Sequence, residues 1–583
     1  MPGWPAVIAA GAIVAAAVVR PRLALAAFAA FFPIAPALCS ALLQIPARAA
    51  ENVLLALVAG LVARRACRRD DPSPPRAFAW AAAAFAIVVI VSVLIQAALT
   101  RLVLSPAGFA DAIAQFASTY YDGSRTFSYV VAAVPLLCGA ILAVMVAAYA
   151  RGREASEQIV RMVVTGGAAV ACLNLARMLG AALRSGDALG ALPRVLSSTR
   201  VSAPYGDPNA TGSYFALLLP IALALTLQSS GWRRWCYGLM SALIALALWM
   251  SGSRAALVAI AVVGAGALLV RQRGAAATKR IGVAAAAAAA LLLLALAFPN
   301  PLFDRASTSG ALGIRAEMAR VAGRLWQTNP VLGVGVGQFL QKSGGFVQDE
   351  YVRSLYGREN AHNNFLQILA ELGLVGLAAF GLALLAALGH PAPFGLRAGI
   401  AAFLITCLGG HPLLIPDVNI AFWIALGAAA AAQDAAGGLR RVPAIAAIVA
   451  VIAIAAAPFA YRIERGSLSL DHIGFGVSGW EFSADGRRYR RSDGDATVFV
   501  PRGARQIVLS VRAVDPAAVP TTFRMWLNDR PADSFVVAVD GWQTYRMTMP
   551  GTRGPQFIPL RIAATGNGGR PAAFLLEKIE SVQ

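Results

Sequence analysis

The chain has 583 residues, of which 58% are hydrophobic and only 14% are charged, and its mean hydropathy is +0.65. Soluble domains carry about 25% charged residues, so this composition excludes a soluble cytoplasmic enzyme and a disordered protein. The apolar stretches are continuous runs, whereas the strands of a water-filled β-barrel would alternate. We therefore expect a polytopic α-helical membrane protein.

The chain is strongly basic, with 50 Lys and Arg residues against 29 Asp and Glu residues and a net charge of +21. In a soluble protein this balance would indicate nucleic acid. Here the basic residues gather in alternate short connections between apolar runs, as cytoplasmic loops of membrane proteins do. We therefore expect no nucleic-acid partner.

Residues 1–461 form a multi-span membrane domain with about 12–14 transmembrane helices. The basic connections are cytoplasmic, and the remaining connections face outward, the longest being 299–361. The first run, at about 4–19, follows almost no basic segment and is expected to be a helix and not a signal peptide. The apolar runs lie at about 4–19, 23–44, 52–63, 77–100, 127–149, 162–183, 211–229, 235–250, 254–270, 281–298, 363–389, 398–410, 420–434 and 442–461.

Residues 462–583 have a different pattern, with short alternating runs separated by turn sequences such as DGR, DGD and GNGG. This pattern predicts an all-β sandwich of about eight strands outside the membrane. All six cysteines precede this segment. A hydrophobic core must therefore stabilise the sandwich without disulfides.

His362 opens the segment HNNFLQILAELGLVG, which predicts the start of a transmembrane helix. At helical spacing Gly373 and Gly376 lie within about 40° of His362 around the axis. Glycines on that face predict a closely packed neighbouring helix and place His362 at a seam open to the outer surface. A neutral imidazole there is suited to accept a proton from a hydroxyl. The alternative is an interfacial histidine that caps the helix with Asn360.

Arg254 ends the outward turn Ser251–Arg254, in which Ser253 is expected to cap the following helix. An arginine in the first turn is unfavourable beside the positive end of the helix dipole. A bound anion would explain it. The alternative is that Arg254 extends to lipid headgroups.

The outward loop contains an amphipathic helix over residues 313–326, with an apolar stripe formed by Ile314, Met318, Val321 and Leu325. We expect this helix to lie on the outer membrane face. Its off-stripe arginines serve either interfacial binding or phosphate binding; they are Arg315, Arg320 and Arg324. The glycine cluster 333–337 is expected to be a flexible turn, because no strand precedes it.

Two further polar segments, 200–209 and 411–419, lie at helix ends. Capping alone would explain Asp207, Asn209 or Asp417, and Asp417 alternatively orients His362. The outward loops between the apolar runs contain no DxD, HExxH or Cys/His cluster, so no obligatory metal is expected. Arginines must then neutralise any phosphate charge.

Three features occur together in this chain: the SGSR turn, the long outward loop ending NPVLGVGVG, and the HN motif with Gly373 and Gly376. In this combination the chain resembles the O-antigen ligase and polymerase superfamily of bacterial envelope glycan transferases. The likeness covers about residues 200–430 and is greatest to the ligases. It implies a GT-C-like fold at the bacterial inner membrane, with the site and the β domain in the periplasm. The β domain itself is not part of the family's common pattern.

The resemblance further implies transfer of a glycan from polyprenyl diphosphate to an acceptor hydroxyl, inverting and without cofactor or metal. The expected acceptor is lipid A-core or another saccharide, and membrane lipids surround the enzyme. The catalytic residues would be His362 with the diphosphate-binding pair Arg254 and Arg315, and Asp417 would be the later acidic residue. The expected substrate-binding residues are Arg200, Asn209, Arg320, Arg324, Asn363 and Asp417.

Several alternatives stay open at this stage. A polymerase and a protein O-oligosaccharyltransferase use the same donor as a ligase. An envelope lipid transporter would use ionisable residues within the membrane, for which Arg177 and Glu371 are candidates. The β domain is either a lid or docking module, or a sugar-binding module that uses exposed rings, although such aromatics are more often core; they are Trp480, Trp526, Trp542 and Tyr545.

Overall fold

The chain forms two compact units, one of Met1–Val93 with Tyr129–Ala457 and one of Leu94–Ser128 with Pro458–Gln583. The expected helix at 281–298 lies outside the residues that the structure describes. The computed structural model describes residues 4–41, 50–68, 70–103, 113, 127–184, 201–202, 204–270, 305–349, 352, 358–389, 392–432, 440–466, 474–478, 481–483, 486–550, 557–577 and 579–582.

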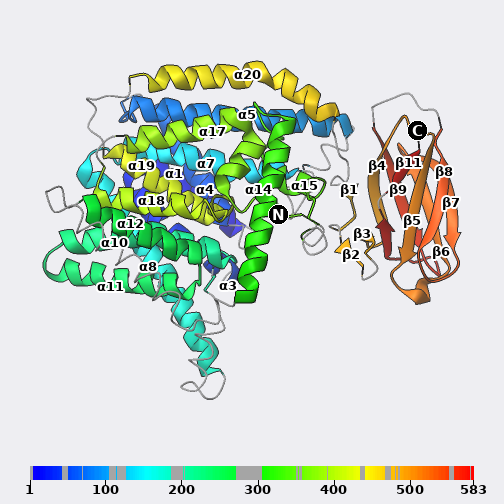
Figure 1. Ribbon diagram of the computed structural model, residues 1–583, viewed down its shortest axis with the longest axis horizontal. Helices are drawn as coiled ribbons and strands as arrows, with labels where there is room; N and C mark the ends of the chain where they lie inside the picture. Colours follow the sequence, from blue (N-terminus) through cyan, green and yellow to red (C-terminus); the bar gives the residue numbers. More distant parts are fainter. Residues whose placement is uncertain are drawn as a thin grey trace. The chain divides into compact units, whose positions relative to one another are not determined.

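The first unit is helical. In Figure 1, α10, α11 and α17 run along one direction, whereas α14 runs across it. The helices that lie wholly or partly in this unit are α1 (Trp4–Val19), α2 (Pro21–Phe31), η1 (Phe32–Ile34), α3 (Ala35–Ala41), α4 (Ala50–Cys67), α5 (Arg76–Val103), α7 (Ser128–Tyr149), α8 (Arg153–Leu183), α10 (Pro208–Gln228), α11 (Gly231–Met250), α12 (Arg254–Val270), α14 (Arg305–Thr328), α15 (Phe339–Ser343), α17 (Asn364–Leu388), α18 (Phe394–Thr406), η5 (Pro412–Leu414), α19 (Pro416–Ala431) and α20 (Val442–Gly466).

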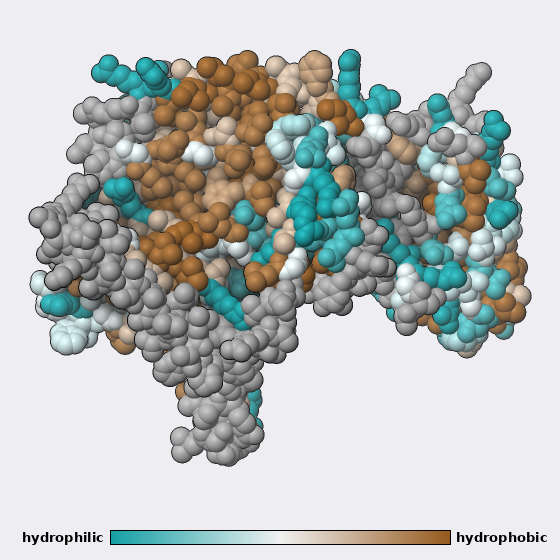
Figure 2. All heavy atoms as spheres, in the orientation of Figure 1, coloured by the Kyte–Doolittle hydropathy of each residue, from teal (hydrophilic) through white to brown (hydrophobic). Residues whose placement is uncertain are grey.

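Within the described residues, seven helices are long and apolar enough to cross a membrane, and four shorter apolar helices accompany them. Figure 2 shows a continuous hydrophobic surface on this unit. Large apolar side chains of α20, among them Ile448, Val451 and Ile454, are exposed. Such a surface is stable only against lipid. The protein is therefore a multi-pass helical membrane protein with a β domain, as the sequence predicts.

Helix α19 forms the centre of this unit, since every residue from Val418 to Ala431 is buried. Its Trp423 ring lies 5.7 Å from the ring of Phe85 and 6.2 Å from that of Phe380, between centroids. Gly139 of α7 leaves the space for the indole, because a Cβ there would overlap Trp423. A small residue thus permits close helix contact at a large aromatic side chain.

Helix α17 is interrupted at Gly373, whose φ of 67° is left-handed. A Cβ at Gly373 would overlap the backbone of Val331 and Leu332. The prediction that this face packs against a neighbouring helix is wrong at Gly373, because the irregular segment at Val331 and Leu332 lies against it. The N–H groups of Leu374 and Val375 donate to the carbonyls of Pro330 and Val331, at 3.0 and 3.2 Å.

Gly373→Ala should strongly reduce the amount of folded protein, because both the positive φ and the close backbone contact exclude a side chain. Gly381→Ala is the matched control in the same helix, since no atom lies within 4 Å of its added Cβ and alanine favours helix by about 1 kcal/mol. Thermal unfolding in detergent measures both variants. Equal melting temperatures would contradict the interruption of α17.

The second unit contains a β-sandwich of two antiparallel sheets, as predicted, with eleven strands among the described residues. One sheet has the order β1 (Gly474–Phe475), β4 (Asp495–Pro501), β9 (Phe557–Thr565), β6 (Thr521–Leu527) and β7 (Arg530–Val537). The other has the order β11 (Glu580–Val582), β5 (Gln506–Ala513), β10 (Phe574–Glu577), β3 (Arg488–Ser492) and β2 (Glu481–Phe482), with β8 (Gln543–Thr548) paired to β5.

The sandwich core follows from strand alternation. Alternate residues of β5 and β6 are buried, and Phe523 lies at the centre, stacked on Phe535 at 5.0 Å and edge-on to Phe574 at 5.2 Å. Trp526 and Trp542 are only partly buried, and the guanidinium groups of Arg561 and Arg487 lie over their rings. Neither tryptophan is among the buried core residues, and the choice between a docking module and a sugar-binding module stays open. Trp480 lies outside the described residues.

Phe523→Ala should destabilise the sandwich by about 3–5 kcal/mol, the usual cost of removing a buried aromatic ring. Val536→Ala, an exposed position on the edge strand β7, should change stability little. The measurement is the urea dependence of proteolysis of the sandwich in the intact protein. Equal resistance of the two variants would contradict the assigned core.

Candidate active site

The apolar stripe of α14 packs inside the protein. Ile314, Met318, Val321 and Leu325 are all buried and share a core with residues of the segment 334–361 and of α17. The expectation that this helix lies on the membrane surface is therefore wrong, because the stripe has a protein partner. The amphipathic pattern itself is confirmed, and it leaves Arg315 off the buried stripe.

Glu317 binds two of the three arginines that lie off the apolar stripe of α14. Its fully buried carboxylate accepts from the guanidinium groups of Arg320 and Arg324, the latter at 3.1 Å, and from the N–H of Gln348 at 2.8 Å. Burial favours the neutral acid, but these donors together lower the pKa of Glu317 below its ordinary value. Arg324 also donates to the carbonyl of Phe346 at 2.5 Å. Arg320 and Arg324 thus stabilise the loop after α14.

The glycine cluster 333–337 is buried over most of its length and bonded to α17, so the expected flexible turn is not observed. The N–H groups of Val334 and Gly335 donate to the carbonyls of Ala370 and Glu371, at 2.9 and 3.0 Å. The Glu371 side chain accepts from the N–H groups of Gly337 at 2.9 Å and Phe339 at 3.1 Å. This carboxylate joins the loop to α17.

Gln367 extends the same network to His362. Its Nε2 donates to Glu371 at 2.8 Å, and its Oε1 accepts from the N–H of Ala361 at 2.9 Å. His362 follows directly, with a left-handed φ of 49°. Such a backbone conformation in a non-glycine residue persists only where its surroundings impose it. The position of the imidazole therefore depends on Gln367 and Glu371.

Asn363 is the N-cap of α17. Its Oδ1 accepts from the N–H groups of Phe365 and Leu366, at 2.9 and 3.0 Å, and its Nδ2 donates to the carbonyl of Leu408 at 3.0 Å. The N-cap is thus Asn363, and the alternative, a cap by Asn360 with His362, is not observed. The His362 side chain therefore does not cap the helix.

His411 lies opposite His362, with ring centroids 5.0 Å apart. Each imidazole Nε2 faces a carboxylate: His362 is 3.9 Å from Glu359 Oε1, and His411 is 3.8 Å from Asp207 Oδ2. Asp207 is also the N-cap of α10, accepting from the N–H of Asn209 at 2.7 Å. Segments distant in sequence thus converge on the two histidines.

Arg254 is positioned by the turn between α11 and α12, which packs on α10. Ser251 and Ser253 are fully buried, and a Cβ at Gly212 would overlap Ser253. The expected cap by Ser253 is not observed, because its buried Oγ has no hydrogen-bond partner among the described residues. The close approach at Gly212 fixes where α12 begins.

Arg315 joins this site from α14. Burial lowers its pKa, and the positive charge of Arg254 lowers it further. Burial likewise lowers the pKa of His362, and the charge of Arg315 adds to this effect while Asp207 opposes it. Among the described residues Arg315 makes no hydrogen bond or ion pair. The site therefore offers two guanidinium groups and a neutral imidazole, which suits an anion beside a hydroxyl.

The other expected site residues lie differently. Asn209 is exposed in the first turn of α10. Asp417, at the start of α19, acts electrostatically on Tyr205 and Tyr214, and the carboxylates that face the histidines are Glu359 and Asp207. Arg200 lies outside the described residues. Its role and those of Asn209 and Asp417 stay predictions.

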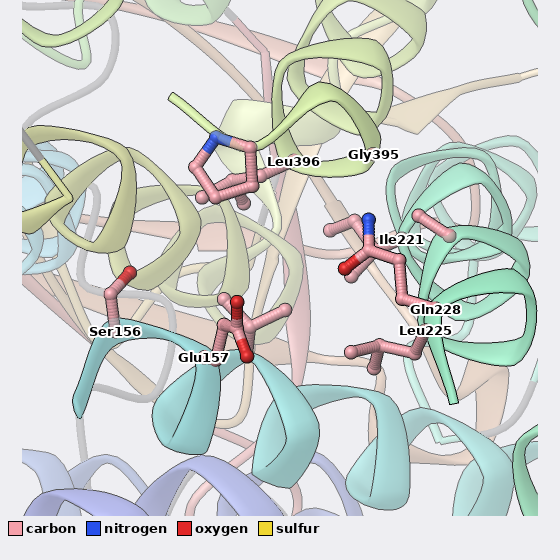
Figure 3. Close-up of a pocket in the computed structure, with 10 residues that line it drawn as sticks. Ser156, Glu157, Ile221, Leu225, Gln228, Gly395 and Leu396 are labelled. Atoms are coloured by element: carbon pink, nitrogen blue, oxygen red, sulfur yellow. The ribbon is translucent and has the colours of Figure 1, made fainter. Parts of the chain in front are cut away.

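A shallow crevice lies at the opposite end of α10 from Asp207 (Figure 3). It is lined by α8, α10 and α18 residues that include Glu157, Ile221, Gln228 and Leu396. Glu157 is paired there with Arg153 and Arg161, at 3.1 and 3.2 Å. This crevice is separate from the histidines and adds no group to the site.

Comparison with known proteins covers this region of the chain. Residues 239–381 match the O-antigen ligase family. The resemblance seen in the sequence is thereby confirmed at the level of the superfamily, and the match supports glycan transfer of the ligase or polymerase type. The O-antigen ligase segment contains Arg254, Arg315 and His362, whereas Asp207 and His411 lie outside it. No curated protein matches the chain.

Glu371→Ala should destabilise the helical unit by about 3–5 kcal/mol, because it leaves buried N–H groups of the glycine loop without an acceptor. Leu374→Ala, an exposed position in the same helix, is the control. Thermal unfolding in detergent measures the difference. If both variants unfold alike, Glu371 does not anchor the loop.

Proposed function

We propose that this protein transfers a glycan from a polyprenyl diphosphate to an acceptor hydroxyl at the periplasmic face of the bacterial inner membrane, with lipid A-core as the acceptor. The observation that carries this proposal is the placement of Arg315, whose charge acts on His362 and which itself lies close enough to Arg254 to be affected by its charge. The O-antigen ligase match over the segment that contains all three residues supports it.

The proposed reaction is a single displacement with inversion. His362 accepts the proton of the acceptor hydroxyl, whose oxygen bonds to the anomeric carbon. The bond between that carbon and the diphosphate oxygen breaks, and the electron pair leaves with the diphosphate. Negative charge grows on the leaving group as this bond breaks, so Arg254 and Arg315 stabilise the transition state more than the ground state. Arginine suits this role because its planar group binds phosphate bidentately.

The distribution of charge along α10 and α11 supports an outward-facing site. Asp207, next to the histidines, begins α10, and the basic pair Arg233 and Arg234 follows its other end. Basic connections are cytoplasmic in most membrane proteins, which supports a periplasmic position for the histidines. The segment 462–583 would then also be periplasmic.

Glu371 is one of the two candidate relay residues in the transporter alternative. Its carboxylate accepts hydrogen bonds from Gly337, Phe339 and Gln367. A carboxylate bound in this way serves the fold. We therefore favour an enzyme.

His362→Ala should lower glycan transfer by about 10²- to 10⁴-fold, because the reaction loses its base. Arg315→Gln should lower it by about 10²-fold, and Arg315→Lys should retain more activity, because the charge remains without the bidentate fork. Arg153→Gln, on the exposed start of α8, is the control. The measurement is mass spectrometry of the product formed from lipid-linked glycan and purified lipid A-core. Full activity of His362→Ala at normal membrane abundance would refute the proposal.

A deletion strain distinguishes the acceptor. Complete repeat chains left on the carrier would indicate ligation, and single-repeat products would indicate a polymerase. Loss of glycan from a protein with unchanged lipopolysaccharide would indicate protein glycosylation. Gel analysis of the envelope polysaccharide and of glycoproteins gives these readouts.

The pH dependence of transfer should follow the pKa of His362. Because burial and Arg315 lower that pKa, the neutral base persists below the ordinary range of histidine, and activity should fall only as pH drops through the lowered pKa. Arg315→Gln removes the repulsion and should move the acid limb to higher pH. The pH profile of the residual rate of that variant tests this sign. An acid limb moved to lower pH would contradict the assignment.

A further inference from the structure

The geometry points to His411 as a second functional histidine: we propose that its imidazole and that of His362 together hold the proton that leaves the acceptor hydroxyl. This inference rests on the proposed function and adds a residue that lies outside the O-antigen ligase segment. The two rings are 5.0 Å apart, and each faces its own carboxylate, Glu359 or Asp207.

The hydrogen bonding of His411 is unlike that of a structural histidine. Its buried Nδ1 has no hydrogen-bond partner among the described residues. A histidine retained only for packing would be expected to satisfy such an atom, because nearly all buried polar atoms are paired. An imidazole with one unpaired nitrogen, with a carboxylate near its other nitrogen and with a second imidazole next to it is instead suited to bind and release a proton.

The charges around the pair favour one shared proton. The groups that face both rings are Arg315 from α14, Asp207 before α10, and Glu359. Burial lowers the pKa of His411, the charge of His362 lowers it further, and Asp207 and Glu359 oppose this effect. The two carboxylates therefore stabilise one imidazolium, whereas a second one would be repelled by the first and by Arg315.

The pair fits the proposed transfer with atoms and charge balanced. The acceptor O–H bond breaks and its proton goes to the two imidazoles, while the acceptor oxygen bonds to the anomeric carbon. The bond from that carbon to the diphosphate breaks, and its electron pair stays on the diphosphate, next to Arg254 and Arg315. The proton then returns to water or to the departing diphosphate. Sharing keeps the new positive charge from residing on His362 alone, beside Arg315.

The test is the pH profile of His411→Gln, assayed with lipid-linked glycan and lipid A-core. We expect kcat to fall by about 10- to 100-fold with the KM for the lipid-linked donor unchanged, since both arginines remain. The acid limb should move to lower pH, because a single imidazole beside Arg315 binds a proton more weakly than the pair does. His472→Gln, which removes the same side chain from the C-terminal segment, should behave as the unmodified chain.

Chemical rescue separates this role from a structural one. Imidazole added to His411→Gly should restore part of the rate in the same sample, and rescue does not depend on how much of the variant folds. Unchanged kcat and pH profile in His411→Gln would overturn the inference. A lower kcat with an unmoved acid limb and no rescue by imidazole would overturn it too. Should His362→Ala and Arg315→Gln also keep full activity, the proposed function itself would fail; if they are inactive, only the second histidine would.

Discussion

The site depends on two like charges held together. Arg254 and Arg315 come from different helices, and the charge of Arg254 acts on the half-buried guanidinium of Arg315. Positive groups in a partly buried place repel, so the fold must hold them by other contacts. Ser251, Ser253 and Gly212 do so for Arg254, and the apolar stripe of α14 does so for Arg315. Repulsion between the two arginines lowers the stability of the protein, and binding of an anion offsets this loss.

Glu371 connects the glycine loop with the segment that carries His362. It joins the glycine loop to α17, and through Gln367 it reaches the residue before His362. The left-handed backbone of His362 is then fixed from the protein interior. The backbone at the histidine before α17 is thus supported by one buried carboxylate, which is not itself one of the proposed catalytic groups.

The sequence predicts the components of the site better than their contacts. Apolar runs predict the membrane helices, strand alternation predicts the sandwich, and the spacing of Ile314 and Met318 predicts the buried face of α14. The partner of that face was misjudged, because an amphipathic stripe packs equally well on lipid or on protein. The broken turn at Gly373 is not predicted, because its spacing of eleven residues from His362 fits an unbroken helix. Convergence of His411 with His362, 49 residues apart along the chain, is set by tertiary packing, which no local spacing encodes.

Helix α17 must both fit the bilayer and hold the residue before its N-terminus in position. The interruption at Gly373 assigns these two requirements to different parts of the helix. In an unbroken helix, any tilt or change in length that adapts the membrane-buried part to bilayer thickness would rotate the residues at its end. Here the N–H groups directly after Gly373 donate to the carbonyls of Pro330 and Val331, which lie outside the helix. We therefore expect adjustment to the surrounding lipid to be taken up after that joint, with little change in the position of the imidazole relative to the guanidinium groups.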